Sequence, residues 1–284
     1  MIAQLVRNLL TPKSRVLKSS EHLSRKVLHA LDAARTSGIP VQCNLGCGTR
    51  YHPDWINVDF HGNGVDVFAW DLRNGLPFND QSCDAVYSSH AIEHFDRKGA
   101  RQFLEECRRV LKPGAVIRLV APDLEGIVRS YLSVLDAAIR EETGAADKYE
   151  WVVIELLDQL VRHQSGGEML KHWCQPIVPE ESFVAKRVGT EYWRAREHCK
   201  GRHSDNPSLK AEDVGSFRLG GEVHQWMYDR YSLGRLLGDC GFQDIHSCSA
   251  NESAIDGFSK YHLDTEPNGT VYNPDSFFIE AKAP

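Results

Sequence analysis

The stretch Val41-Gln-Cys-Asn-Leu-Gly-Cys-Gly48 decides the fold class of this chain of 284 residues. Its first part, which ends at Leu45, is a short apolar run typical of a buried strand. The strand runs directly into two glycines, Gly46 and Gly48, and glycines let the backbone approach a ligand that a Cβ would exclude. They fall at the carboxyl end of the strand, where open α/β sheets bind their ligands.

More short apolar runs follow, separated by turns and helices. The runs that predict strands are Trp55–Asp59, Val65–Asp71, Cys83–Ser88, Ala115–Ala121, Phe242–Ser249 and Ser276–Glu280. Asp96 can cap a helix that reaches about Leu111 on an apolar stripe, and a second helix is predicted around residues 231–237. This alternation predicts an open, mainly parallel α/β sheet.

Two segments lie outside the alternating pattern. Residues 1–38 predict two amphipathic helices with seven Lys and Arg against two acidic residues. We expect this N-terminal helical extension to pack on the body or on a second subunit, with a peripheral membrane or partner contact as the alternative. Residues 39–284 form the predicted domain, in which about 124–222 show no strand alternation and predict a helical cap insertion.

Composition narrows the class of protein further. The 33 basic and 39 acidic residues give a net charge of −6, which does not favour nucleic-acid binding. No apolar run is long enough for a transmembrane helix, and the first residues lack the pattern of a signal peptide, so a cytoplasmic protein is expected. The eight cysteines form no CxxC pair, which predicts buried thiols in a reducing compartment rather than disulfides or a zinc site.

Acidic residues at strand ends indicate the kind of ligand. Asp59, at the end of the second strand, can accept both hydrogen bonds of a ribose diol, and Asp71 can accept one from the amino group of an adenine. A nucleoside-like cofactor is the common element. A nicotinamide dinucleotide is disfavoured because Gly48 is followed by Thr49-Arg50-Tyr51, without the third glycine of that fingerprint.

Residues 41–124 resemble the class I S-adenosylmethionine-dependent methyltransferases. Leu45-Gly-Cys-Gly48 matches the first motif of that family, Asp59 its ribose-binding acid, His90-Ala-Ile-Glu-His94 its (L/I)EH segment, and Arg109–Gly114 its turn before the fifth strand. The resemblance implies a Rossmann-like seven-stranded sheet and S-adenosyl-L-methionine as cofactor. Within the family, the chain looks most like predicted methyltransferases found among polysaccharide and cell-surface glycan genes.

The resemblance also implies a cofactor site on the first four strands. Its predicted residues are Asn44, Leu45, Gly46, Cys47, Gly48, Asp59, Phe60, Asp71, Leu72, Ser88 and Ser89. The chain departs from the family because Arg50 replaces the third glycine and because Gly48 and Asp59 are only eleven positions apart. That spacing predicts a turn or a single helical turn in place of a full helix. Arg50 either binds the methionine carboxylate or is a surface residue.

Methyl transfer to a hydroxyl requires removal of a proton, so a general base is expected. The candidate catalytic residues are His90, Glu93, His94 and His224, with Glu93 as an orienting acid. Histidine suits the role because its ordinary pKa lies near neutrality. No carboxylate cluster has convincing metal-binding spacing, so no metal is expected.

The cap insertion is expected to cover the acceptor. Its aromatic and histidine residues could stack on a sugar or form an ordinary core: Tyr149, Trp151, His172, Trp173, Tyr192, Trp193, His198 and His203. The predicted activity is O-methylation of a sugar, a glycan or a related small hydroxylated acceptor. The alternatives are N-methylation of a small molecule and a non-catalytic methyltransferase-like scaffold, and a dimer is compatible with the basic extension.

Overall fold

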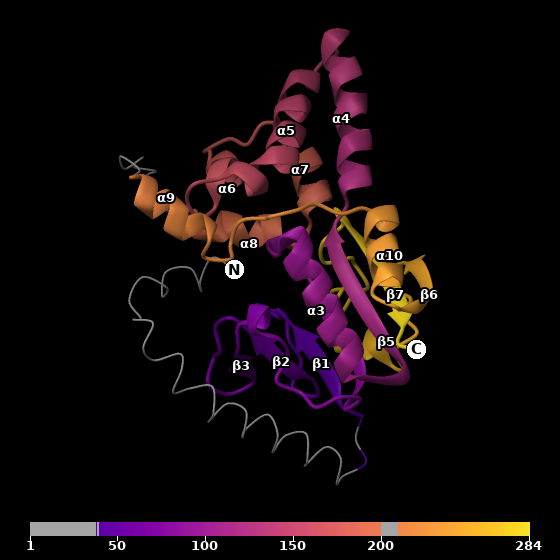
Figure 1. Ribbon diagram of the computed structural model, residues 1–284. Coiled ribbons are helices and arrows are strands. Elements are labelled where there is room, and N and C mark those ends of the chain that lie inside the picture. Colours follow the sequence, from indigo (N-terminus) through magenta and orange to yellow (C-terminus); the bar gives the residue numbers. More distant parts are fainter. Residues whose placement is uncertain (1–37, 39, 200–209) are drawn as a thin grey trace.

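The computed structural model describes residues 38, 40–199 and 210–284, so the predicted N-terminal helical extension and His203 lie outside the described residues. A seven-stranded sheet forms the centre of the described part (Figure 1). Its strands are β1 (Gln42–Leu45), β2 (Ile56–Asp59), β3 (Val67–Ala69), β4 (Cys83–Ser89), β5 (Leu111–Pro122), β6 (Gln243–Cys248) and β7 (Ser276–Lys282).

The strand order is β3-β2-β1-β4-β5-β7-β6. All neighbouring pairs are parallel except those of β7, which runs antiparallel to both β5 and β6. The order reverses between β1 and β4, so the carboxyl ends of these two strands flank the crevice where such sheets bind ligands. The prediction of a Rossmann-like seven-stranded α/β sheet is confirmed.

Two helices cover one face of the sheet. Helix α3 (Arg97–Val110) begins at Asp96, whose side chain accepts a hydrogen bond from the Gly99 backbone N–H at 2.6 Å. Its buried stripe, which includes Phe103 and Leu104, packs with residues of helix α10 (Arg230–Asp239) on the inward face of β1, β4 and β5. This is the main hydrophobic core, and it fixes the positions of the strand ends.

The opposite face of the sheet is covered by a different kind of segment. Alternate strand residues such as Tyr87 and Val120 point to this side and pack against residues between 250 and 263. That covering segment connects β6 to β7 and contains a short 3₁₀ helix, η5 (Phe258–Tyr261). The connection over residues 46–55, all of them described, contains no helix, as the spacing of Gly48 and Asp59 predicts.

A buried charged network holds the covering segment in place. Arg118 on β5 is fully buried and donates hydrogen bonds to Asp264 and to Glu280, both at 2.7 Å. The Tyr87 hydroxyl donates to the second oxygen of Asp264 at 2.6 Å. Because each buried charge has partners, the segment is anchored to the sheet at defined points.

The described residues of the insertion between β5 and α10 fold into helices and the turns between them. Its helices are α4 (Leu124–Ile139), α5 (Ala145–Val161), α6 (Gly167–Trp173), α7 (Glu181–Val188), α8 (Thr190–His198) and α9 (Ala211–Arg218). The helices α4 to α7 stand above the sheet in Figure 1. Together with α8 they share a second core that includes Trp151, Trp173 and Tyr192. Among the described residues, no helix is long and apolar enough to cross a membrane.

One prediction about the cysteines is wrong. Cys174 and Cys199 form a disulfide that joins the end of α6 to the end of α8, with their Cα atoms 5.1 Å apart. The two residues are 25 positions apart and only the packing of the cap helices brings them together. Of the other cysteines, five are buried free thiols, as predicted, and Cys248 is partly buried.

Two strand boundaries also differ from the prediction. The third strand is shorter than the predicted Val65–Asp71. The side-chain oxygen of Asn63 accepts hydrogen bonds from the backbone N–H groups of residues 65–67, and this forms a turn before the strand begins. The fifth strand starts at Leu111 directly after α3, so Pro113 and Gly114 lie within it instead of in a separate turn. A shift in the β4–β5 register next to Cys83 accommodates them.

Candidate active site

The glycine loop after β1 leaves room for a ligand on one side only. Gly46 has φ +71°, and a Cβ there would lie 2.7 Å from the Cβ of Ala91. Gly48 has φ +54°, and a Cβ there would meet no described atom within 4 Å. Gly46 is therefore required by packing, whereas Gly48 borders the open space that a cofactor would fill.

Asp59 faces this loop from the end of β2. One carboxylate oxygen accepts from the Gly48 backbone N–H at 2.8 Å and the other from the His61 N–H at 3.1 Å. A carboxylate has about four acceptor sites, so each oxygen keeps one for a ribose hydroxyl. The next residue, Phe60, is 50% exposed and lies beside the same opening. These residues fit a bound nucleoside.

Other predicted cofactor residues lie behind the loop. Asn44 is fully buried, and its side-chain amide donates to the Arg50 carbonyl at 3.0 Å and to Asn57 at 3.2 Å. Buried Ser88 donates to the Leu45 carbonyl at 2.8 Å. These contacts make them positioning residues for the loop. The Cys47 thiol is also buried, and burial raises its pKa, so it is held as a neutral thiol.

Asp71 and Leu72 lie on the adjacent strand end. Asp71 caps the short 3₁₀ helix η3 (Leu72–Asn74), and both of its oxygens accept from the Arg73 guanidinium at 2.8–3.1 Å. The Leu72 side chain approaches Gly46. Contact of Asp71 with an adenine stays a prediction, and Arg73 would share the carboxylate. Ser89, half-buried at the end of β4, also stays a predicted contact.

Arg50 does something that neither of its two expected roles describes. Its guanidinium donates to the carbonyls of Leu263 at 3.3 Å, His262 at 2.6 Å and Thr265, and it lies 4.2 Å above the ring of Tyr272. These contacts engage its donors in the covering segment. Arg50 therefore connects the glycine loop to the covering segment between β6 and β7.

The structure brings all four candidate catalytic residues together. His90 follows β4, Glu93 and His94 belong to the 3₁₀ helix η4 (Ile92–His94), and His224 comes from the segment after the cap. Glu93 Oε1 lies 3.4 Å from His90 Nδ1 and 4.0 Å from His224 Nε2. The rings of His94 and His224 meet edge to face with centroids 4.9 Å apart. We call these four residues the His–Glu cluster.

Backbone contacts fix the two halves of the cluster relative to each other. The Glu93 carbonyl accepts from the backbone N–H groups of Gln225 at 2.7 Å and Trp226 at 3.2 Å. The His224 N–H donates to the Gln159 carbonyl of α5 at 3.0 Å. The cluster thus lies where the sheet, the cap and the segment returning from the cap meet.

Burial and charge shift the pKa values within the cluster in different directions. Burial lowers the pKa of His224 to about 3. Burial opposes the charged forms of His90 and Glu93 too, but each charge favours the other. The pKa of His90 therefore rises to about 9 and that of Glu93 falls to about 2.

The far side of His90 faces the start of β7. Its Nε2 lies 2.8 Å from the Ser276 hydroxyl and 3.1 Å from the side-chain amide of Asn273. His90 also has φ +50°, a conformation that residues with a Cβ rarely adopt and that clusters at functional sites. The chain therefore accepts backbone strain to place this ring.

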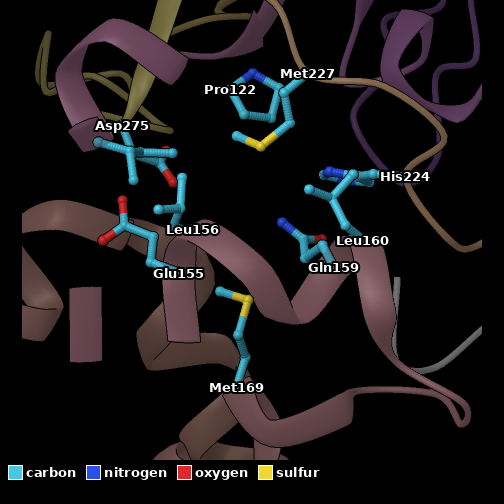
Figure 2. A pocket seen from close by; sticks show the side chains of 10 residues that line it. Pro122, Glu155, Leu156, Gln159, Leu160, Met169, His224, Met227 and Asp275 are labelled. Carbon is cyan, nitrogen blue, oxygen red and sulfur yellow. The ribbon is translucent and has the colours of Figure 1, made fainter. Parts of the chain in front are cut away.

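A small cavity lies between the cluster and the cap (Figure 2). His224 and Asp275 face it from different elements, and Glu155 and Gln159 line it from α5. Its volume is about 10 Å³, which is room for about one water molecule. Burial and the nearby Glu155 raise the pKa of Asp275 to about 7.

Sequence reasoning missed Asp275 and Glu155 as site residues. Asp275 precedes the last strand, so its place at the carboxyl edge of the sheet is a consequence of β7 running antiparallel beside β5. The Pro274-Asp275-Ser276 turn before that strand was the available signal. Glu155 carried no signal, because it comes from a helix of the cap and pairs with Arg187 at 2.6 Å.

The aromatic residues of the cap divide into two groups. Trp151, Trp173 and Tyr192 are buried in the cap core and cannot stack on an acceptor. Trp193 on α8 is 55% exposed, and Trp226, beside the His–Glu cluster, is 42% exposed. Trp226 is therefore an exposed indole whose backbone contacts a candidate catalytic residue, Glu93.

Part of the chain matches a known family of domains. Residues 47–119 match the family model of a methyltransferase domain. The chain is also similar to solved structures of an S-adenosylmethionine-dependent methyltransferase from Archaeoglobus fulgidus (14% identity, TM-score 0.38, covering 95% of this chain and 100% of that one) and a possible histamine N-methyltransferase from Thermotoga maritima (14%, 0.37, 95% and 97%). No curated protein matches the chain.

The matched segment contains Cys47 and Gly48 of the glycine loop, Asp59 and the first three members of the His–Glu cluster. The match identifies a methyltransferase domain within the chain, and the strand order is that of a Rossmann-like sheet. The cofactor of the domain is S-adenosyl-L-methionine. The loop from Gly46 to Gly48 and the carboxylate of Asp59 stay its predicted binding residues.

Proposed function

We propose that this methyltransferase transfers a methyl group to a hydroxyl of a sugar, a glycan or a related small hydroxylated acceptor. The observation that carries the proposal is the convergence of His90, Glu93, His94 and His224 at the carboxyl edge of β4, next to the cap. A neutral amine can attack a methyl group directly through its lone pair. A neutral hydroxyl is a weaker nucleophile and reacts readily only as it loses its proton. A cluster of histidines beside a carboxylate suits that acceptor.

The residues divide the work between two ends of the crevice. The glycine loop and Asp59 bind the nucleoside part of the cofactor, and the His–Glu cluster receives the hydroxyl proton. S-adenosylmethionine supplies an electrophilic methyl group, so that the acceptor oxygen forms a C–O bond as the C–S bond breaks. Holding the two reactants in line can contribute roughly 7–11 kcal/mol to lowering the barrier in the best cases.

Trp226 is the residue that favours a sugar acceptor. Its half-exposed ring lies next to the cluster, because its backbone N–H binds the Glu93 carbonyl. The Arg97 guanidinium lies 5.1 Å from the ring centroid. An exposed indole held in this way gives an apolar platform for the C–H face of a sugar ring, with hydroxyls directed to polar neighbours.

The first experiment measures methyl transfer from labelled S-adenosylmethionine to free sugars, nucleotide sugars and lipid-linked sugars. Products are analysed by mass spectrometry for a methyl ether. We expect a sugar hydroxyl to be labelled. Transfer to amines alone would replace the proposal by N-methylation, and cofactor binding without transfer to any acceptor would favour a non-catalytic scaffold.

Trp226→Ala tests the acceptor platform. Loss of an aromatic contact worth about 0.5–1.5 kcal/mol should raise KM for the acceptor by up to roughly tenfold, with an unchanged Kd for S-adenosylmethionine. The matched control is Trp193→Ala, which removes another exposed indole, one that contacts Tyr192 of its own helix α8. Equal KM values for both variants and the wild type would contradict the role of Trp226.

The basic N-terminal extension suggests where the reaction takes place. A glycan acceptor would be compatible with work at a membrane surface, and the seven basic residues of 1–38 would suit such a contact. Sedimentation of the full chain with anionic and neutral vesicles separates this contact from a dimer interface. Binding to neither vesicle, with a dimer in solution, would favour the subunit contact.

A further inference from the structure

We propose that Glu93, His94 and His224 form a binding site for a divalent metal ion, with zinc as the best-suited ion. One ligand atom of each residue lies within 4.8 Å of the others. Two histidine nitrogens and one carboxylate oxygen are a ligand set that zinc uses in catalytic sites, where a fourth position stays open. This inference departs from our expectation from the sequence that the protein has no metal site.

The strongest observation is a set of buried polar atoms without partners. Glu93 is 1% exposed, its Oε1 has only the looser ion pairs with His90 at 3.4 Å and His224 at 4.0 Å, and its Oε2 has no partner among the described residues. His94 Nδ1 is likewise buried and unpartnered. Buried polar groups are nearly always satisfied, so each of these atoms calls for an explanation. A cation between them satisfies several of them at once.

The charges around Glu93 leave a place for such an ion. His90 lies on one side of the carboxylate, with Nδ1 at 3.4 Å from Oε1. His224 Nε2 lies 4.0 Å from the same oxygen. Arg162, whose charge acts on His224, is already paired with Asp158 at 2.8 Å and with Glu222 at 3.6 Å. Among the described residues, Glu93 therefore has only histidines as ion-pair partners, and a cation can lie between it, His94 and His224.

The backbone supports the ligands as a metal site requires. Zinc ligands at 2.0–2.1 Å from the ion lie about 3.4 Å apart, so the side chains need to move by about 1 Å. The hydrogen bonds from Gln225 and Trp226 to the Glu93 carbonyl hold the segment of His224 against η4 during that movement. Supporting contacts of this kind orient metal ligands in proteins.

The site deepens the proposed function, and its chemical role rests on that function. The open position of the ion lies in the cluster where the acceptor hydroxyl is expected. Metal coordination lowers the pKa of a bound hydroxyl, so that its proton leaves to water and the oxygen is ready to attack the methyl group. The ion would then take over the task that the sequence assigns to a histidine base.

The test uses the untagged full chain, stripped with a chelator and dialysed against one equivalent of Zn²⁺. We expect about one bound zinc per chain by mass spectrometry of the metal, and visible absorption bands of tetrahedral Co²⁺ after substitution with cobalt. Glu93→Gln and His94→Ala should each weaken zinc binding by at least about tenfold, the range shown even by supporting residues of metal sites. Circular dichroism confirms that each variant is folded.

The matched control is His172→Ala, which removes a buried histidine of the cap with an unpartnered Nε2. Zinc binding that is equal in the wild type, in His94→Ala and in Glu93→Gln would overturn the site, as would a wild-type Kd above the millimolar range. Metal binding is measured without cofactor or acceptor. If O-methyl transfer persists in the stripped protein, the catalytic role of the metal is wrong and the proposed O-methyltransferase function stands. If the protein binds zinc but methylates only amines, the metal site stands and the proposed function is wrong.

Discussion

Among single residues, Asp59 has both a structural contact and a predicted contact with the cofactor. Its carboxylate holds the Gly48 backbone and keeps acceptor sites for the ribose. Asp59→Ala should weaken S-adenosylmethionine binding by roughly 100-fold, because two hydrogen bonds to a charged group are worth roughly 1.5–3 kcal/mol each and are only partly replaced by water. Titration calorimetry measures the change. Asp54→Ala, an exposed acid on the same connection, is the control, and equal losses in both variants would contradict the assignment.

Asp275 makes stability depend on pH. Its pKa of about 7 is raised by burial and by Glu155 and Glu191, against His90 and Arg187, from 3.8 in the unfolded chain. The unfolded chain therefore loses this proton first, and the contribution of Asp275 to stability falls as pH rises from about 4 to about 7. Asp275→Asn should remove that fall.

Urea unfolding at pH 5 and pH 8 measures the effect of Asp275→Asn. From pH 5 to pH 8, the free energy of unfolding of the variant should rise by about 1–2 kcal/mol relative to that of the wild type. This is less than the full pKa shift of Asp275 implies, because the side chain is only partly buried. An equal pH dependence in both proteins would show that Asp275 is ionised in the folded state at neutral pH.

The glycine loop illustrates how one element uses two identical residues differently. Gly46→Ala should lower the free energy of unfolding by about 2–4 kcal/mol, since the left-handed backbone costs roughly 1–2 kcal/mol and the new Cβ would meet Ala91. Gly48→Ala carries only the backbone cost, but its methyl group enters the cofactor space. Denaturation and calorimetry on both variants separate the roles, and equal stabilities would contradict them.

At the scale of elements, strands and helices with strong periodic patterns were predictable. The buried run before Gly46 and the stripe of α3 contain their own signals, because a strand repeats every two residues and a helix every 3.6. Asp96 also fixed the start of α3. The start of the 67–69 strand was not predictable, because it depends on the turn made by Asn63.

The position of the covering segment between β6 and β7 depends on ion pairs between residues far apart in the sequence. Arg118, Asp264 and Glu280 lie in separate parts of the sequence and carry no pattern that links them. Their burial together on the second face of the sheet replaces the helix that the short 46–55 connection lacks. Arg50 adds the contact between that segment and the glycine loop.

At the scale of the whole molecule, the disulfide between Cys174 and Cys199 stabilises the cap. Closing a loop of this length is worth about 3–4 kcal/mol in the chain-entropy account. Replacing both residues by serine should lower the midpoint of thermal unfolding and speed proteolysis within the cap. A reductant should have the same effect on the wild type and none on the variant.

The disulfide also bears on the setting of the protein. Disulfides are rare in reducing compartments, so this bond weighs against the reducing compartment that the cysteine spacing predicts. A thiol count on the native purified chain under denaturing, non-reducing conditions decides it: six free thiols indicate the bond and eight its absence.

The sequence by itself determined the order of strands and helices, the glycine loop and its acid, and the four residues of the His–Glu cluster as separate candidates. Each of these is a local signal, carried by residues within a turn or two of one another. Only the tertiary structure decided that His224 joins Glu93, that Asp275 faces the same cavity and that Arg50 holds the covering segment. These contacts join chain segments that are at least about fifty residues apart. Side-chain packing brings such segments together, and no repeat in the sequence predicts it.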